Sequence, residues 1–281
     1  MKSFKSIWSI TLQNFRKWKK DYRIWISFIF AAIFINSYTK ELSTFCNYVN
    51  IKSSAWIYPF LYMQYYTKIL FFFPLLLIFS NAPFIDTNQL YVISRSGRFK
   101  WCIGQLLYIV ISSGLYFIFV FVFSIILNIN CIDFTEEWGK VMNTLANTDS
   151  SLKFNIGFTP DKNVISLFSP IQAVWFTLLH SWISGTILGM TIFLFNMMFK
   201  GSGTFVSSFI LVFSAIASKD ISLTRYSPVT WSTLNYIHLH RNDNLPDYSY
   251  VISYYSVVVM VLITAILLFS RKYNYDKDFK V

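Results

Sequence analysis

The residues of this chain that could bind or react are few, and the densest group of them is basic. It follows an apolar segment, leads into another one, and consists of Ser94, Arg95, Gly97, Arg98, Lys100 and Trp101. Basic side chains beside a membrane contact the phosphates of anionic lipid headgroups. Nucleic-acid binding is the rival interpretation, but apolar segments on both sides of the stretch make it weak. The stretch is therefore a candidate binding surface.

Three histidines are the next candidates, and each has a structural interpretation that we favour. His238 and His240 flank Leu239, so they face apart on a helix and share a face on a strand. A metal site would need further ligands, and we expect these two to be interfacial residues near the outer membrane surface. His180 lies within an apolar segment, where a neutral ring can hydrogen-bond a neighbouring helix. An ionisable residue at such depth is also a functional candidate, so the role of His180 stays open.

The patterns of common catalytic sites are absent from the sequence. The apolar segments hold no pair of carboxylates, which argues against a proton relay or an intramembrane aspartyl protease. The chain has no H-E-x-x-H and no serine nucleophile elbow. The stretch Gly201-Ser-Gly-Thr204 lacks the lysine and spacing of a phosphate loop and predicts a tight turn. We expect no catalytic residue, no metal, no cofactor and no ATPase site within this chain.

The cysteines and one lysine have simple interpretations as well. Cys46, Cys102 and Cys131 form no C-x-x-C pair and no zinc-ligand spacing. Cys102 is most simply a small buried apolar residue. Cys46 and Cys131 can both lie outside the membrane, where a disulfide is one possibility and free thiols are the simpler one. Lys68 begins an apolar segment, and we expect its ammonium group to extend to the membrane surface.

The elements around these residues are those of an all-α integral membrane protein. Of 281 residues, 55% are hydrophobic and only 13% are charged, against about 25% charged in soluble domains. A bilayer crossing takes about 20 apolar residues as a helix. We predict six transmembrane helices in one domain spanning 1–281, at about 24–38, 69–85, 101–128, 171–199, 204–218 and 250–270.

Residues 1–20 predict an additional helix that lies in the membrane interface. Phe4, Trp8, Leu12 and Phe15 recur at helical spacing, and basic residues together with neutral polar ones such as Ser9 and Gln13 lie between them. Aromatic residues opposite basic ones are typical of an amphipathic interfacial helix. A plain basic flank of the first crossing is the alternative.

The distribution of charge predicts the orientation. With the N-terminus inside, the cytoplasmic segments hold fifteen of the 24 basic residues and four of the 13 acidic ones. The whole excess of +11 then lies on one side, as the positive-inside rule requires. The loop at 86–100 and both termini are cytoplasmic in this arrangement, and the segments 129–170 and 219–249 lie outside. Both outside segments are too long for tight turns, so they should hold short helices or ordered loops.

The basic stretch and this layout resemble the permease subunits of type-2 ABC transporters, the exporter class that includes bacterial peptide and drug efflux permeases. In such permeases a basic segment with an aromatic residue precedes the third crossing and resembles the coupling helix that docks on a separate ATPase. The resemblance assigns ATPase coupling to Ser94, Arg95, Gly97, Arg98, Lys100 and Trp101. Gln105 departs from the pattern, since many relatives have lysine there.

The resemblance implies a permease that forms its pathway as a homo- or heterodimer. Its partners would be a separate ATP-binding subunit, a second permease subunit and membrane lipid, and the first, second and fifth crossings would line the subunit interface. The location would be the bacterial plasma membrane, and the cargo a peptide or other hydrophobic or amphipathic compound. The alternative is a non-transport membrane protein, such as an immunity, sensor or assembly factor, without an ATPase partner.

Overall fold

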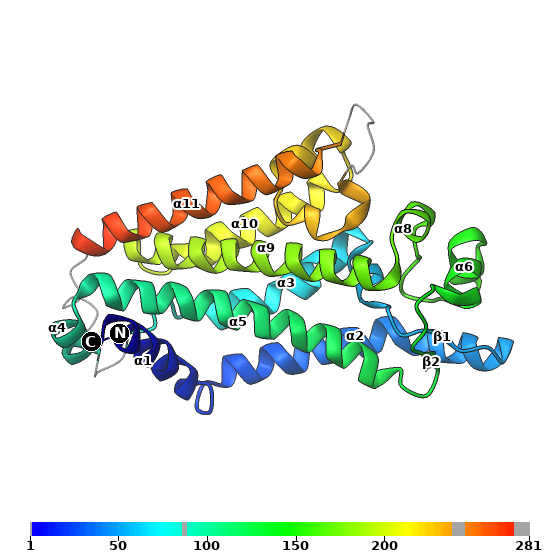
Figure 1. Cartoon of the computed structure of the whole chain (residues 1–281), viewed down its shortest axis with the longest axis horizontal. Coiled ribbons are helices and arrows are strands. Elements are labelled where there is room, and N and C mark those ends of the chain that lie inside the picture. The colour runs from blue at the N-terminus through cyan, green and yellow to red at the C-terminus, as the bar shows by residue number, and fades with distance from the viewer. Residues whose placement is uncertain (1, 86–88, 238–244, 273–281) are drawn as a thin grey trace.

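The chain folds into a bundle of long helices with a small irregular region at one end (Figure 1). The computed structural model describes residues 2–85, 89–237 and 245–272. Asp86, His238, His240 and the last nine residues lie outside these ranges. The six longest helices of the described part, apart from the N-terminal α1 (Lys2–Lys17), are α2 (Tyr22–Val49), α3 (Tyr65–Phe79), α5 (Arg98–Leu127), α9 (Pro170–Met198), α10 (Ser202–Ala217) and α11 (Tyr248–Lys272).

Three helices in the described ranges are long and apolar enough to cross a membrane. These are α5, α9 and the part of α11 from Tyr248 to Arg271, and α3 and α10 are apolar but shorter. The chain therefore has the helical composition of a membrane protein. Six crossings stay a prediction, because the other helices in these ranges do not meet the same standard of length and hydropathy. The orientation stays a prediction as well.

Helix α2 is much longer than the apolar run that predicted it. It continues past Tyr38 to Val49 and includes Lys40 and Glu41. A helix of 28 residues is about 42 Å long, whereas the apolar core of a bilayer is about 30 Å thick. Its second half instead buries Leu42, Phe45 and Cys46 against other parts of the protein.

Helix α9 is the centre of the bundle and contacts α3, α5, α10 and α11. The most apolar stretch of α9 is 78% buried inside the protein, whereas the corresponding stretch of α11 is 17% buried. Two glycines make close packing possible: a Cβ at Gly185 would lie 2.7 Å from Phe117, and one at Gly189 would lie 2.6 Å from Ile109. Small residues at a helix contact let neighbouring helices approach closely in membranes.

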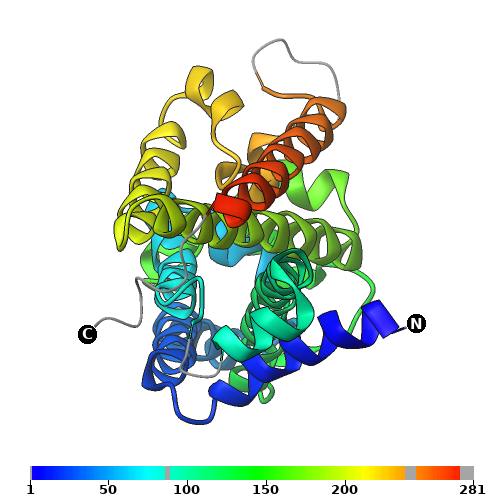
Figure 2. The ribbon, with the colours of Figure 1, turned by 90° about the vertical axis from the view of Figure 1, so that its left-hand side faces the viewer.

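The two ends of the bundle differ in structure. At one end, which we call the α4 end, lie α1, the short helix α4 (Gln89–Ser96) and the C-terminal end of α11 (Figures 1 and 2). The opposite end, the β end, carries two short strands, β1 (Ser53–Ser54) and β2 (Ile132–Asp133), which pair in parallel. Its remaining short helices are η1 (Tyr58–Tyr62), α6 (Gly139–Asn147), α7 (Ser150–Lys153), α8 (Lys162–Leu167), η2 (Ile221–Tyr226), η3 (Thr230–Ser232) and η4 (Leu234–Tyr236).

Lys68 does not extend to a membrane surface, and that prediction was wrong. Its side chain is 0% exposed. The ammonium group donates a hydrogen bond of 2.8 Å to Ser218 Oγ and lies 4.2 Å from the centre of the Tyr236 ring. The segment from Ser218 to Tyr236 covers the start of α3, which the sequence pattern alone does not reveal.

Candidate functional site

The predicted basic stretch forms a sharp corner between two helices at the α4 end. Helix α4 ends at Ser96, and α5 begins at Arg98. Gly97 joins them with a φ of +83°, a conformation that glycine adopts without the steric penalty of other residues. Its N–H donates to Ile93 O at 2.8 Å, and its carbonyl accepts from Trp101 N–H at 3.1 Å. Gly97 is therefore required by the backbone of the corner.

Trp101 fastens α4 to α5 from the inside. Its side chain is fully buried, and its Nε1 donates a hydrogen bond of 2.6 Å to Oε1 of Gln89, the first residue of α4. Gln89 is fully buried as well, and the Trp101 ring also contacts Phe193 of α9. Trp101 is thus a buried anchor that holds α4 against α5.

The outward face of the corner is basic and aromatic. Tyr91 is 78% exposed and Phe99 is 56% exposed, and Ser94 and Arg95 are exposed between them. The Ser94 hydroxyl donates to Tyr91 O at 2.9 Å, within the same helix. We call Tyr91, Ser94, Arg95 and Phe99 the α4 surface.

Arg98 and Lys100 lie at the start of α5, where they differ in what they contact. Arg98 Nη1 donates a hydrogen bond of 2.7 Å to the backbone carbonyl of Arg271. The corner is thereby joined to the end of α11, far away in the sequence. Lys100 is half-buried. Of the six predicted coupling residues, the structure exposes Ser94, Arg95 and Arg98, buries Trp101, and uses Gly97 for the turn.

A polar cluster beneath the corner joins α1 to α5. Asn14 Nδ2 donates to Gln105 Oε1 at 2.5 Å, and Trp18 Nε1 donates to Tyr108 Oη at 2.8 Å. Asn14 and Gln105 are both buried. Many of the permeases that the sequence resembles have lysine at the position of Gln105. In this chain the residue is a neutral glutamine, and its partner is the neutral Asn14.

The side of α1 that faces the protein is polar at its centre. Thr11 Oγ1 donates to Gly104 O at 3.0 Å, and a Cβ at Gly104 would lie 2.8 Å from Ile10. Phe4 is 68% exposed, and Trp8 is exposed as well. The segment 1–20 contains the helix α1, and its amphipathic, interfacial character stays a prediction.

The loop from Ser80 to Ile85 is held by long polar side chains from three elements. Lys17 Nζ donates to Phe84 O at 2.7 Å, and Arg23 Nη1 donates to Ser80 Oγ at 2.9 Å. Asn196 of α9 donates to Ala82 O at 2.9 Å and accepts from Gly203 N–H of α10 at 2.8 Å. The loop therefore connects the N-terminal segment to the turn between α9 and α10.

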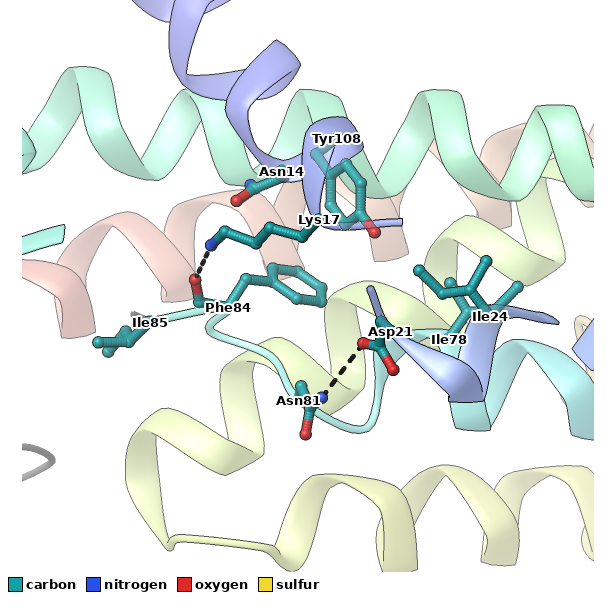
Figure 3. Close-up of a pocket in the computed structure, with 9 residues that line it drawn as sticks. All are labelled: Asn14, Lys17, Asp21, Ile24, Ile78, Asn81, Phe84, Ile85 and Tyr108. Atoms are coloured by element: carbon teal, nitrogen blue, oxygen red, sulfur yellow. Dashed lines mark hydrogen bonds between the residues drawn. The ribbon is translucent and has the colours of Figure 1, made fainter. Parts of the chain in front are cut away.

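Two pockets open beside this loop. One, of about 320 Å³, is lined by Asn14, Lys17, Asp21, Ile24, Ile78, Asn81, Phe84, Ile85 and Tyr108 (Figure 3). The other, of about 400 Å³, is lined by Arg23, Ser80, Asn81, Ala82, Pro83, Ile85, Asn196, Lys200 and Gly201. In Figure 3 Asn81 points toward Asp21, and Lys17 reaches across to the carbonyl of Phe84. These contacts tie the loop from Ser80 to Ile85 to the N-terminal segment beside the pocket.

His180 hydrogen-bonds within its own helix, whereas we expected a hydrogen bond to a neighbouring helix. Its Nδ1 lies 2.6 Å from Phe176 O, one turn earlier in α9, and its ring contacts Tyr248 and Tyr255 of α11. Within the described ranges, no group of three or more metal-ligating side chains is close enough to hold an ion. His238 and His240 lie outside those ranges.

The chain matches no protein-family model, no curated protein and no solved structure.

Proposed function

We propose that this chain is the permease subunit of an ATP-driven exporter, that it works as a dimer, and that a separate ATP-binding subunit docks on the α4 surface. One observation carries the proposal. The exposed α4 surface, which includes Tyr91, Arg95 and Phe99, lies at the corner formed by Gly97. This corner leads directly into α5, a helix long and apolar enough to cross a membrane. The same stretch carries the resemblance to coupling segments of type-2 permeases.

The contacts of the corner suit the transmission of movement. The Trp101–Gln89 hydrogen bond is buried and joins α4 to α5, and Arg98 joins the corner to the end of α11. A partner that displaces α4 would therefore move two long helices together. Rigid-body shifts of packed elements are a common form of switching between states.

One side of this chain has exposed apolar residues that a second permease subunit could contact. Exposed apolar residues recur along one side of α2, at Trp25, Ile29 and Ile33, and along α10, at Phe205 and Phe209. Helix α3 contacts both α2 and α10, and Figure 2 shows the three helices along one side of the bundle. These helices correspond to the first, second and fifth predicted crossings, which supports a dimer formed through this face. A pathway bordered by such residues suits a peptide or another hydrophobic or amphipathic cargo.

The docking proposal is tested by reversing one exposed charge. The tagged chain is purified in mild detergent from membranes of the organism that makes it, and bound proteins are labelled with 8-azido-ATP. The wild-type chain should retain an ATP-binding subunit, and Arg95→Glu should lower the retained amount about tenfold or more, which corresponds to about 1.4 kcal/mol. Lys20→Glu is the matched control, since Lys20 is also exposed, lies between α1 and α2, and is not part of α4.

Two results would overturn the proposal. One is a wild-type chain that retains no ATP-labelled subunit, which would favour the non-transport alternative. The other is retention by Arg95→Glu equal to that of Lys20→Glu, which would show that the subunit binds elsewhere.

A further inference from the structure

Cys46 and Cys131 are 85 positions apart in the sequence but meet at the β end. Cys46 lies in the last turn of α2, and its carbonyl accepts hydrogen bonds from the N–H groups of Asn50 and Ile51. Cys131 directly precedes β2, and its carbonyl accepts a hydrogen bond of 2.9 Å from Ser53 N–H. The same short segment, 50–53, therefore holds the backbone of both cysteines.

The two thiols are also neighbours. Both are buried, at 4% and 5% exposure, in one apolar cluster, and neither is bonded to another cysteine in this structure. The interaction between the two side chains is the largest influence on the ionisation of each: it lowers the pKa of the Cys131 thiol and raises the pKa of the Cys46 thiol. Two cysteines that lie next to each other in the fold are the arrangement that a disulfide requires.

We propose that Cys46 and Cys131 form a disulfide that joins the end of α2 to the end of α5. The charge distribution predicts that the β end lies outside the cytoplasm, and disulfides persist in such compartments. Cys102, by contrast, lies in the first turns of α5 at the α4 end, where it is buried and should stay reduced. The proposal is independent of any ATPase partner.

The oxidant is a protein disulfide of an extracytoplasmic thiol oxidoreductase. The Cys131 thiolate attacks one sulfur of that disulfide, which forms a mixed disulfide and releases one thiolate of the oxidant. The Cys46 thiolate then attacks the Cys131 sulfur, which forms the Cys46–Cys131 bond and releases the second thiolate. The two protons of the thiols go to solvent or to the released thiolates, and the oxidant leaves as a dithiol. Because both cysteines are buried in the folded protein, oxidation takes place while the β end is folding.

The test counts protected cysteines in membranes of the organism that makes the chain. Free thiols are blocked with N-ethylmaleimide in SDS, disulfides are then reduced, and the released thiols are labelled with a maleimide that carries polyethylene glycol. We expect two labels per wild-type monomer, two for Cys102→Ser, and none for Cys46→Ser or Cys131→Ser. Absence of label on the wild-type chain, or a disulfide-linked species of twice the monomer mass, overturns the proposal.

A second measurement covers variants that fold poorly. Dithiothreitol should lower the melting temperature of the purified wild-type chain and of Cys102→Ser, but should leave that of the double variant Cys46→Ser/Cys131→Ser unchanged. A wild-type melting temperature that does not respond to the reductant contradicts the proposal, whatever the ATPase experiment shows.

Discussion

Asn196 gives the sharpest prediction about what holds the α4 end together. Its side chain is buried and is bonded on both sides: Nδ2 to Ala82 O at 2.9 Å, and Oδ1 to the N–H of Gly203 at 2.8 Å. The substitution Asn196→Ala leaves this carbonyl and this N–H group without the partner that each has in the structure. An unsatisfied buried polar group costs about 1–3 kcal/mol, so the two together lower the free energy of unfolding by about 2–6 kcal/mol.

The assay is unfolding in mixed micelles with increasing SDS, followed by tryptophan fluorescence. Asn147→Ala is the matched control, because Asn147 is exposed and its side chain donates only to Asn143 O, one turn earlier in α6. Surface changes of this kind usually stay within about 0.5 kcal/mol. If Asn196→Ala unfolds at the same SDS fraction as the control, the loop from Ser80 to Ile85 is not held by Asn196 and the reasoning is wrong.

Two further predictions concern buried hydrogen bonds and use the same assay. Trp101→Phe leaves Gln89 Oε1 buried without its donor, so it should cost about 1–3 kcal/mol, and adding Gln89→Leu should recover part of the loss because both partners are then apolar. A double variant no more stable than the single one contradicts this. Ser218→Ala removes the hydrogen-bond acceptor of the fully buried Lys68 ammonium and should also cost about 1–3 kcal/mol. Lys68→Met should make the Ser218 change harmless, and an equal loss in both backgrounds refutes the role of that bond.

The sequence predicted the apolar helices well because hydropathy is a local property. The segments expected at 101–128, 171–199 and 250–270 correspond to α5, α9 and α11 within about three residues at each end. The sequence did not predict the length of α2, because Lys40 and Glu41 end an apolar run without ending a helix. Hydropathy indicated only a polar loop before Gly97, where eight residues form α4, and a helix there was suggested solely by the resemblance to coupling helices.

The contacts of the candidate site could not be predicted from the sequence, for a different reason. Asn196 and Ala82 are 114 positions apart, and Asn14 and Gln105 are 91 apart, so neither pair leaves a periodic signal. The residue types did identify Arg95 and Gly97 as special, since a basic group and a turn residue can be recognised locally. Trp101 was grouped with them, but its burial against Gln89 depends on how α4 folds back on α5. The burial of Lys68 likewise depends on the segment that covers it.

The central claim is that this chain couples a separate ATPase to a membrane pathway through α4. The most direct measurement is the rate of ATP hydrolysis by the subunit that co-purifies with the chain, free in solution and bound to the chain in lipid nanodiscs. Binding to the wild-type chain or to Lys20→Glu should change the rate severalfold, and the chain with Arg95→Glu should leave it at the value of the free subunit. Equal rates with and without the wild-type chain would contradict the claim.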